Sequence, residues 1–174
     1  MPAEFTVHVR IPSWTRAFWV RVNGQVVEPL LLPDDLNAPV QMASGYSPYG
    51  AFYVSITRAW SPGDSIELDL PMPIVIRRPH RKVKGNRGRH ALTRGPLVYC
   101  LESIDNPEID VFGVKLDLAT LRPERSPERA AQPLWSSPMW VIRGQTADGR
   151  GFTAIPYFVW ANRGASQMTV MVRA

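Results

Sequence analysis

The stretch FWVRVNGQVV, residues 18–27, decides the fold class of this chain. Its two arms alternate apolar and polar residues on either side of Asn23-Gly24, and this period of two is typical of a half-buried β-strand. Asn-Gly is the preferred pair for a type I′ turn, because both central residues of that turn need a positive φ. The stretch therefore predicts an antiparallel hairpin.

Further alternating stretches and short apolar runs extend this pattern along the chain. They predict strands at 5–12, 49–60, 65–71, 73–78, 90–95, 97–102, 111–118, 138–146, 152–160 and 167–174. SPGD (61–64) and ADGRG (147–151) supply the turns of two more hairpins. Besides the two arms of the first hairpin, these are about ten strands at the spacing of sandwich folds, and no long stretch has the helical period. We expect an all-β fold: an antiparallel, jelly-roll-like β-sandwich, or two small ones, with little or no helix.

Proline is frequent, with 17 prolines against 12 glycines in 174 residues. Because proline is excluded from helix interiors and central strands, it favours many short elements. Two proline-bearing stretches, 29–48 and 121–133, are predicted to be surface loops. A shift in composition at the start of the stretch 77–94 indicates a domain boundary. We therefore expect a first β-sandwich over residues 1–78 and a second over residues 79–174.

Cys100 is the only cysteine. A catalytic thiolate needs a base or an electropositive setting, and a zinc site needs three or four ligands, often at short spacing. No histidine lies at ligand spacing from Cys100; His90, for example, is ten residues away. Since free cysteine is among the most buried residue types, we predict that Cys100 is a buried structural residue.

The stretch 77–94 carries eight Lys or Arg residues and no acidic residue, within a chain of net charge +5. Such a patch can bind phosphates. It lacks the interleaved aromatic residues of single-strand binders and matches no nucleic-acid motif. We expect no nucleic-acid partner, and interpret the stretch as a solvated connector or a face that docks on an acidic neighbour.

Two groups of carboxylates could carry chemistry. Glu67 and Asp69 lie at i and i+2 on one strand face, near the separation used in glycoside hydrolysis, but such pairs are common on solvent-exposed sheet faces. Asp105, Glu108 and Asp110 could form a Ca²⁺ site, although their spacing is not that of an EF-hand. We assign no catalytic, cofactor or metal residue to this chain.

Six tryptophans could stack on sugars: Trp14, Trp19, Trp60, Trp135, Trp140 and Trp160. Large aromatic residues also dominate the cores and interfaces of β-sandwiches. We favour core or interface positions for them.

The N-terminus shows no signal peptide, because residues 2–11 alternate instead of forming a charged segment followed by an apolar one. No apolar run approaches the roughly 20 residues of a membrane helix, so we expect no membrane partner. A lone cysteine fits a reducing compartment. These features favour a cytoplasmic location.

Five phrases, in this order and spacing, resemble one known family. They are FTVHVRIPSW (5–14), VNGQ (22–25), WSPGDSIELDLPMP (60–73), NRGRHALTRGPLVYCLE (86–102) and AIPYFVWANRG (154–164). The chain resembles the C-terminal β-rich portion of glycoside hydrolase family 127, the β-L-arabinofuranosidases, formerly a domain of unknown function. The resemblance runs from about residue 4 to residue 172.

The resemblance implies that catalysis belongs to an (α/α)6 barrel that precedes two β-sandwich domains in that family. The barrel carries zinc, a nucleophilic cysteine and the general acid/base, and none of these motifs matches a position here. Cys100 is thus not the family's nucleophile, and zinc is expected only in the barrel. The resemblance also implies that the first sandwich lacks strands before residue 1. Its open sheet edge would then form a dimer or be paired internally.

We therefore expect a non-catalytic accessory module that packs on a catalytic barrel or associates with itself. The stretch 77–94 and the phrase YFVWANRG (157–164) are the predicted contact surface. Its candidate residues are Arg81, Lys82, Lys84, Tyr157, Trp160, Asn162 and Arg163. Two alternatives remain open: a free-standing carbohydrate-binding module, and a hydrolase that acts alone.

Overall fold

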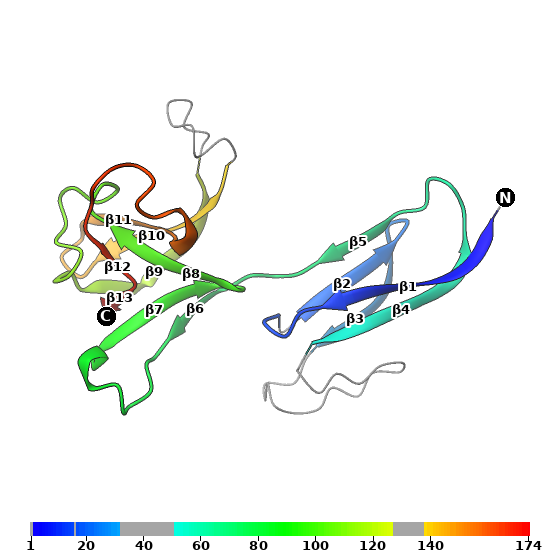
Figure 1. Ribbon diagram of the computed structural model, residues 1–174, viewed down its shortest axis with the longest axis horizontal. Helices are drawn as coiled ribbons and strands as arrows, with labels where there is room; N and C mark the ends of the chain where they lie inside the picture. Colours follow the sequence, from blue (N-terminus) through cyan, green and yellow to red (C-terminus); the bar gives the residue numbers. More distant parts are fainter. Residues whose placement is uncertain (1, 16, 32–50, 127–137) are drawn as a thin grey trace. The chain divides into compact units, whose positions relative to one another are not determined.

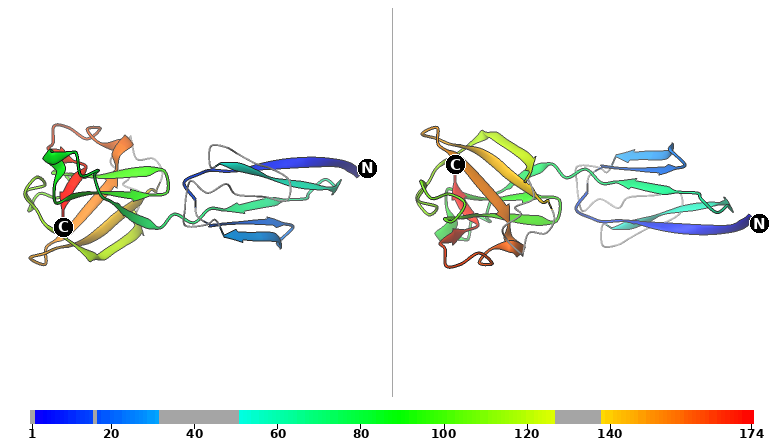
Figure 2. Two further views of the ribbon diagram at one scale, coloured as in Figure 1. Left: turned by 90° about the horizontal axis from the view of Figure 1, so that it is seen from below. Right: turned by 90° about the horizontal axis from the view of Figure 1, so that it is seen from above.

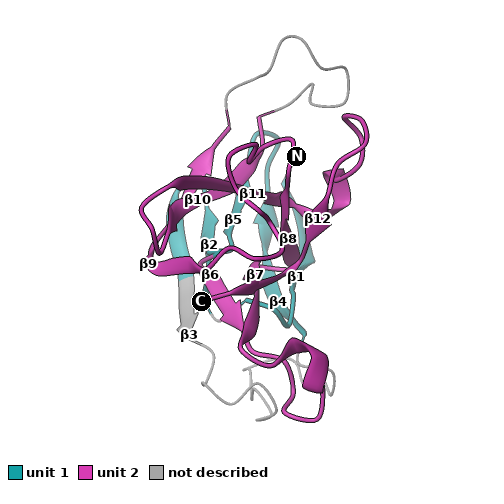
Figure 3. Ribbon diagram, turned by 90° about the vertical axis from the view of Figure 1, so that its left-hand side faces the viewer, with its two compact units in different colours: residues 1–72 teal, residues 73–174 magenta. Residues whose placement is uncertain are grey.

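The computed structural model describes residues 2–15, 17–31, 51–126 and 138–174, and the backbone alone over 28–31. The chain forms two compact units, Met1–Met72 and Pro73–Ala174 (Figure 3). Both units are built from antiparallel strands (Figure 1), and the helical turns in the described residues are two short 3-10 helices, η1 (Lys84–Asn86) and η2 (Tyr157–Val159). This confirms the predicted all-β fold.

Unit 1 is a small sandwich of two sheets (Figure 2). Strand β1 (Ala3–Ile11) pairs with β4 (Phe52–Trp60), and β2 (Ala17–Val22) lies between β3 (Gln25–Leu31) and β5 (Ile66–Asp69). One face of each sheet is apolar, so the two apolar faces bury each other. The core between them consists of Ile11, Phe18, Val20, Val22, Phe52, Ile56 and Trp60.

The outer face of the β1–β4 ladder is polar. Thr6 and Thr57 face each other across it and their hydroxyl oxygens lie 2.8 Å apart, while His8 Nδ1 lies 2.9 Å from the Ser55 hydroxyl. Within the described residues, β1 and β4 pair only with each other. Each therefore leaves one edge without a ladder partner, and such an edge is a site where another strand can pair.

The turn of the β2–β3 hairpin has the geometry that Asn23-Gly24 predicts, with φ of 52° at Asn23 and 78° at Gly24. The Asn23 side chain also secures the neighbouring SPGD turn. Its Nδ2 donates to Asp64 Oδ1 at 2.8 Å, and its Oδ1 accepts from the Ser65 N–H at 2.9 Å. One residue thus fixes two adjacent turns of unit 1.

Gly24→Ala should destabilise unit 1 by about 1 kcal/mol, because alanine is strained at positive φ. A Cβ at Gly24 would meet no atom within 4 Å, so the loss would come from the backbone alone. Gly24→Asn is the matched control, since asparagine tolerates this conformation and should lose less. Urea unfolding of the three proteins measures the difference, and equal stability of Gly24→Ala and Gly24→Asn would contradict this account.

Unit 2 is one eight-stranded sheet that curls almost into a barrel. Its path runs β13 (Met171–Arg173), β7 (Arg89–Arg94), β8 (Leu97–Glu102), β11 (Gly151–Pro156), β10 (Trp140–Thr146) and β9 (Leu116–Arg125). Strands β6 (Ile74–Arg77) and β12 (Met168–Thr169) add to β7 and β8. A single parallel bridge between Lys115 and Arg173 joins the two ends of the path.

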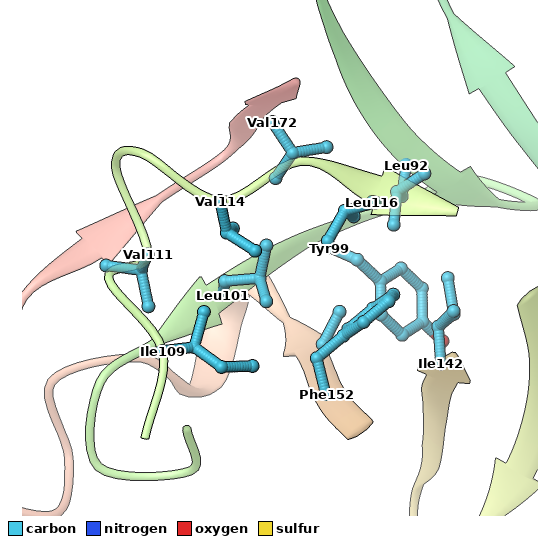
Figure 4. Packing of buried hydrophobic residues seen from close by; sticks show 11 residues of the cluster. Leu92, Tyr99, Leu101, Ile109, Val111, Val114, Leu116, Ile142, Phe152 and Val172 are labelled. Atoms are coloured by element: carbon cyan, nitrogen blue, oxygen red, sulfur yellow. The ribbon is translucent and has the colours of Figure 1, made fainter. Parts of the chain in front are cut away.

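The inside of this curled sheet holds the larger core (Figure 4). It comprises Leu92, Tyr99, Leu101, Ile109, Val111, Val114, Leu116, Ile142, Phe152, Ala154 and Val172. Tyr99 donates its hydroxyl hydrogen to the Trp140 carbonyl oxygen at 3.0 Å, so its one polar atom is satisfied.

Strand β8 is buried on both faces over its last four residues, 99–102. Tyr99 and Leu101 face the main core, while Cys100 joins a second cluster with Val141, Ile155 and Val159. The sheet needs a cover on that second face, and residues 157–167 supply it.

The structure differs from the sequence-based expectation in four places. Residues 29–31, predicted to begin a loop, belong to the backbone of β3. Residues 121–125, predicted to be loop, extend β9 and pair with β10. Pro123 is tolerated there because β9 ends the strand path. Residues 111–114, predicted to be strand, form turns, since the Val114 N–H bonds the Asp110 carbonyl. Finally, β11 ends at Pro156 and η2 follows, where one strand over 152–160 was predicted.

The first compact unit ends at Met72 and the second begins at Pro73, whereas the composition led us to expect a boundary at residue 78. Residues 74–77 form β6, which pairs with β7 of unit 2. The predicted loops at 32–48 and 127–133 lie outside the described residues. No helix in the described parts of the chain is long and apolar enough to cross a membrane.

Candidate functional site

Residues 157–167, here called the strap, follow β11 and cover the second face of β8. Val159 of η2 packs with Cys100, Val141 and Ile155 in the second cluster, and Trp160 adds its ring beside them. The strap turns sharply at Ala161, whose φ is 61°. A non-glycine residue in this conformation is held by its surroundings. Those surroundings are a buried cluster of charged side chains.

Glu102, Asp105, Arg163 and Ser166 form this cluster, here called the ion cluster. Arg163 donates to both carboxylates, and its side chain is only 3% exposed, with Glu102 at 0% and Asp105 at 5%. Glu102 also accepts hydrogen bonds from the Ser166 hydroxyl and, at 3.0 Å, from the Ala161 N–H. The strap is therefore held to β8 through buried charges that are paired and hydrogen-bonded.

Hydrogen bonding decides the protonation state of this cluster. Burial alone would raise the pKa of Glu102, but the hydrogen bonds from Ser166, Ala161 and Arg163 outweigh it, and the net pKa is lowered. The hydrogen bond to Asp105 raises the pKa of Arg163, against the opposing effect of burial. Glu102 and Arg163 are thus ionised at neutral pH. Because their charges are paired with each other, these two side chains stabilise the fold and are not available for proton transfer to a substrate.

Asn106 fixes the base of the same loop. Its Nδ2 donates to the Glu102 carbonyl at 2.8 Å and to the Thr153 carbonyl at 2.9 Å, and its Oδ1 accepts from the Thr153 N–H. This buried amide joins the end of β8 to β11. The loop that carries Asp105 is thereby positioned against the strap.

The strap exposes two neighbouring aromatic side chains. Phe158 is 65% exposed and Tyr157 is 43% exposed, and the Tyr157 ring lies 6.0 Å from the half-buried Trp160 ring. Exposed large apolar residues held on a fixed backbone are typical of contact surfaces. We call Tyr157 and Phe158 the aromatic pair.

A second feature of unit 2 is a basic hollow of about 250 Å³ at the loop between β6 and β7. It is lined by Arg78, Pro79, His80, Arg81, Val83, Arg87, Gly88, Arg89 and His90. A larger hollow of about 430 Å³ lies at the β10–β11 turn, but there Asp148 and Arg150 neutralise each other in an ion pair of 2.7 Å. The smaller hollow is therefore strongly basic, whereas in the larger one the positive charge of Arg150 is paired with Asp148.

The predicted contact residues do not form one surface. Arg81, Lys82 and Lys84 are exposed on the β6–β7 loop, whereas Tyr157 and Asn162 are exposed on the strap and Trp160 is half-buried there. The green η1 and the brown η2 lie apart in every view of Figures 1 and 2. Arg163, predicted to be a surface residue, is in the interior, because the carboxylates of Glu102 and Asp105 draw it inward.

The other sequence candidates are also dispersed. Glu67 and Asp69 are both exposed on β5, and the Glu67 carboxylate lies 4.0 Å from Arg21. Asp105 is committed to Arg163, and Asp110 accepts from the Phe112 N–H at 3.1 Å. Among the described residues, no group of three His, Cys, Asp or Glu side chains is placed to hold a metal ion.

The tryptophans occupy different environments. Trp60 is buried in unit 1, where its indole N–H donates to the Phe5 carbonyl at 3.0 Å. Trp140 is exposed and is covered by the Arg94 guanidinium, 4.7 Å from the ring centroid. Trp14 and Trp19 are half-buried, and Trp135 lies outside the described residues.

Cys100 is buried, as predicted. Burial, and then the charges of Glu102 and Asp105, raise the pKa of its thiol to about 12. A thiol with this pKa is not ionised at neutral pH, so Cys100 is not a nucleophile in the folded chain.

We expect Cys100 to resist alkylation by iodoacetamide at pH 8 in the native protein and to react quickly in denaturant, because the thiolate is the reacting species. Intact-mass spectrometry over time measures both rates. Native labelling as fast as labelling of the unfolded chain would show that the thiol is accessible and ionised.

Comparisons with known proteins agree with this two-unit architecture. Residues 1–72 match the β-L-arabinofuranosidase GH127 middle domain, and residues 74–173 match the glycoside hydrolase family 127 C-terminal domain. The chain is 27% identical to a non-reducing end β-L-arabinofuranosidase of Bifidobacterium longum subsp. longum, over 95% of this chain and 25% of that protein.

Solved structures give the same result. The GH127 β-L-arabinofuranosidase from Geobacillus stearothermophilus T6 is 30% identical with a TM-score of 0.69, over 99% of this chain and 27% of that one. Another GH127 β-arabinofuranosidase is 28% identical with a TM-score of 0.72, over 99% of this chain and 28% of its own. This chain thus spans about a quarter of the length of these relatives.

The all-β fold and the two family matches together define the class of this chain, which is a pair of all-β domains of glycoside hydrolases. Within that class, the chain belongs to glycoside hydrolase family 127 and carries its middle and C-terminal domains. This confirms the resemblance found in the sequence.

Proposed function

We propose that this chain is a non-catalytic accessory module of a β-L-arabinofuranosidase-like enzyme, and that it docks on a catalytic domain of the same family. The aromatic pair carries this proposal. Phe158 and Tyr157 are exposed on a strap that the ion cluster fixes to the sheet. A rigid apolar anchor loses little conformational entropy on binding, which is the property of interface hot spots.

The buried state of Cys100 supports a non-catalytic role. The thiol has its pKa raised to about 12 and lies in an apolar cluster, so it offers no thiolate for a retaining hydrolysis. This argues against the thiolate version of a hydrolase that acts alone. It leaves chemistry to the part of the relatives that lies outside this match.

The test is association of this chain with the separately produced catalytic portion of a family 127 relative, measured by sedimentation velocity. We expect a complex, and a loss of at least about tenfold in affinity for Phe158→Ser, since hot-spot truncations have effects of this size. Phe112→Ser is the matched control, because Phe112 is also an exposed phenylalanine of unit 2 but lies outside the strap.

The basic loop is tested in the same assay with Arg81, Lys82 and Lys84 changed together to Glu. If this charge reversal leaves the affinity unchanged, the loop is not part of the docking surface. Equal effects of Phe158→Ser and Phe112→Ser would rule out the strap as the anchor.

The aromatic pair also supports a second candidate function, carbohydrate binding, because exposed aromatic rings stack on sugars. A titration of the isolated chain with arabinose-rich oligosaccharides, followed by tryptophan fluorescence, tests it. Trp160 lies beside Tyr157 and would report binding. A flat titration counts against this function and leaves the docking proposal standing.

Self-association is a third candidate function, and the open strand edges of unit 1 favour it. Strands β1 and β4 of unit 1 each pair on one side only within the described residues. Size-exclusion chromatography with light scattering should show a dimer if these edges pair between copies. A clean monomer at high concentration would exclude that form of association.

A further inference from the structure

The loop between β6 and β7 is compact and is held by its own backbone hydrogen bonds. Its ends are joined by the β6–β7 ladder, which pairs Arg77 with Ala91. Between them, the Val83 N–H donates to the His80 carbonyl at 2.8 Å and the Arg87 N–H to the Lys84 carbonyl at 3.2 Å. The chain reverses at Gly88 with φ of 72°. The basic hollow is thus framed by a backbone with its own hydrogen bonds.

Within the described residues, no acidic side chain neutralises the positive charge of this hollow. Arg78, Arg81, Arg87 and Arg89 all line it, and no acidic residue occurs between 77 and 94. In the described parts of the chain, none of these four arginines has an acidic side chain within ion-pair distance. Arg173 of the neighbouring strand β13 is paired in register with Arg89, but it is not one of the residues that line the hollow.

Several donors of the hollow are already held in place. Arg89 donates to the Met171 carbonyl at 2.9 Å and to the Phe112 carbonyl at 3.3 Å, so its guanidinium is fixed while its charge remains. His80 Nδ1 accepts a hydrogen bond from the Lys82 N–H at 3.3 Å.

From these features we infer that the basic hollow is a binding site for a phosphate-type oxyanion. Guanidinium groups make charge-assisted hydrogen bonds to such ions with matching geometry. Mutual repulsion of the arginines would be relieved when the ion binds. The volume of about 250 Å³ admits a phosphate group.

The experiment is isothermal titration of the full chain with inorganic phosphate at constant ionic strength, with sodium acetate as the comparison anion. We expect binding with a Kd of about 1 mM or lower, and weaker binding of acetate, which has a single charge. Arg81→Gln and Arg87→Gln should each weaken phosphate binding by about tenfold or more.

Arg125→Gln is the matched control, since Arg125 is an exposed arginine of unit 2 on β9, outside the hollow. The inference is overturned if phosphate gives no more heat than acetate, or if Arg125→Gln weakens binding as much as the hollow variants do. Glycerol 3-phosphate as a second probe distinguishes sources. Tighter binding than phosphate assigns the site to a phosphorylated small molecule, and equal binding assigns it to the free ion. No catalytic domain is needed, so this result is separate from the docking test.

Discussion

Replacement of Arg163 by methionine should destabilise unit 2 by about 3–5 kcal/mol, the size of effect found when one partner of a buried ion pair is removed. The variant would leave the Glu102 and Asp105 carboxylates buried without their cation, since their side chains are 0% and 5% exposed. It would also release the strap from β8. Thermal and urea unfolding measure the loss.

Arg150→Met is the matched control for this variant. Arg150 also pairs with an aspartate, at 2.7 Å, but both side chains are largely exposed, and surface pairs contribute little to stability. We therefore expect a much smaller loss there. If Arg163→Met were as stable as Arg150→Met, the ion cluster could not be what holds the strap.

Phe152→Ala should destabilise unit 2 by about 3–5 kcal/mol, because it opens a cavity in the main core. Phe152 is buried and lies among the side chains of that core (Figure 4). Chemical denaturation of the variant gives the loss of stability, and Phe152→Leu, which keeps most of the volume, should lose clearly less. Equal losses in the two variants would show that the site collapses without forming a cavity.

Gly144 provides an internal check on this packing. A Cβ at Gly144 would lie 2.8 Å from Phe152 Cε1 and 3.2 Å from Leu121 Cδ2. Gly144→Ala should therefore cost about 1–3 kcal/mol by overpacking. The same change should cost less when Phe152 is already alanine, and a double-mutant cycle would measure this coupling. Additive losses would contradict direct contact between the two positions.

Local signals in the sequence predicted much of the fold. Asn23-Gly24 predicted the β2–β3 hairpin because its two positive φ angles are a property of the residues themselves. ADGRG (147–151) likewise predicted the turn between β10 and β11. Errors arose where tertiary context overrides local preference. Pro123 suggested a loop, but it is accommodated in β9 because that strand ends the path.

The candidate site was less accessible to sequence reasoning. YFVWANRG (157–164) was predicted to belong to a contact surface, yet the Arg163 side chain is buried. Its partners Glu102 and Asp105 lie about sixty positions away in the chain, and no local pattern reports a pairing over that separation. The basic hollow could be predicted only in part. The positive charge of residues 77–94 is visible in the sequence, but the hollow itself depends on how this loop folds.

The pairing of β13 has a consequence for synthesis on the ribosome. The strands of unit 1 all precede residue 73, so they can pair while the translation of unit 2 continues. Strand β7 at residues 89–91 finds its partner only in residues 171–173, and the bridge from Lys115 to Arg173 closes the sheet last. Until those residues leave the exit tunnel, unit 2 carries an unpaired edge. The nascent chain is then most exposed to chaperones and to mispairing between the synthesis of β7 and that of β13.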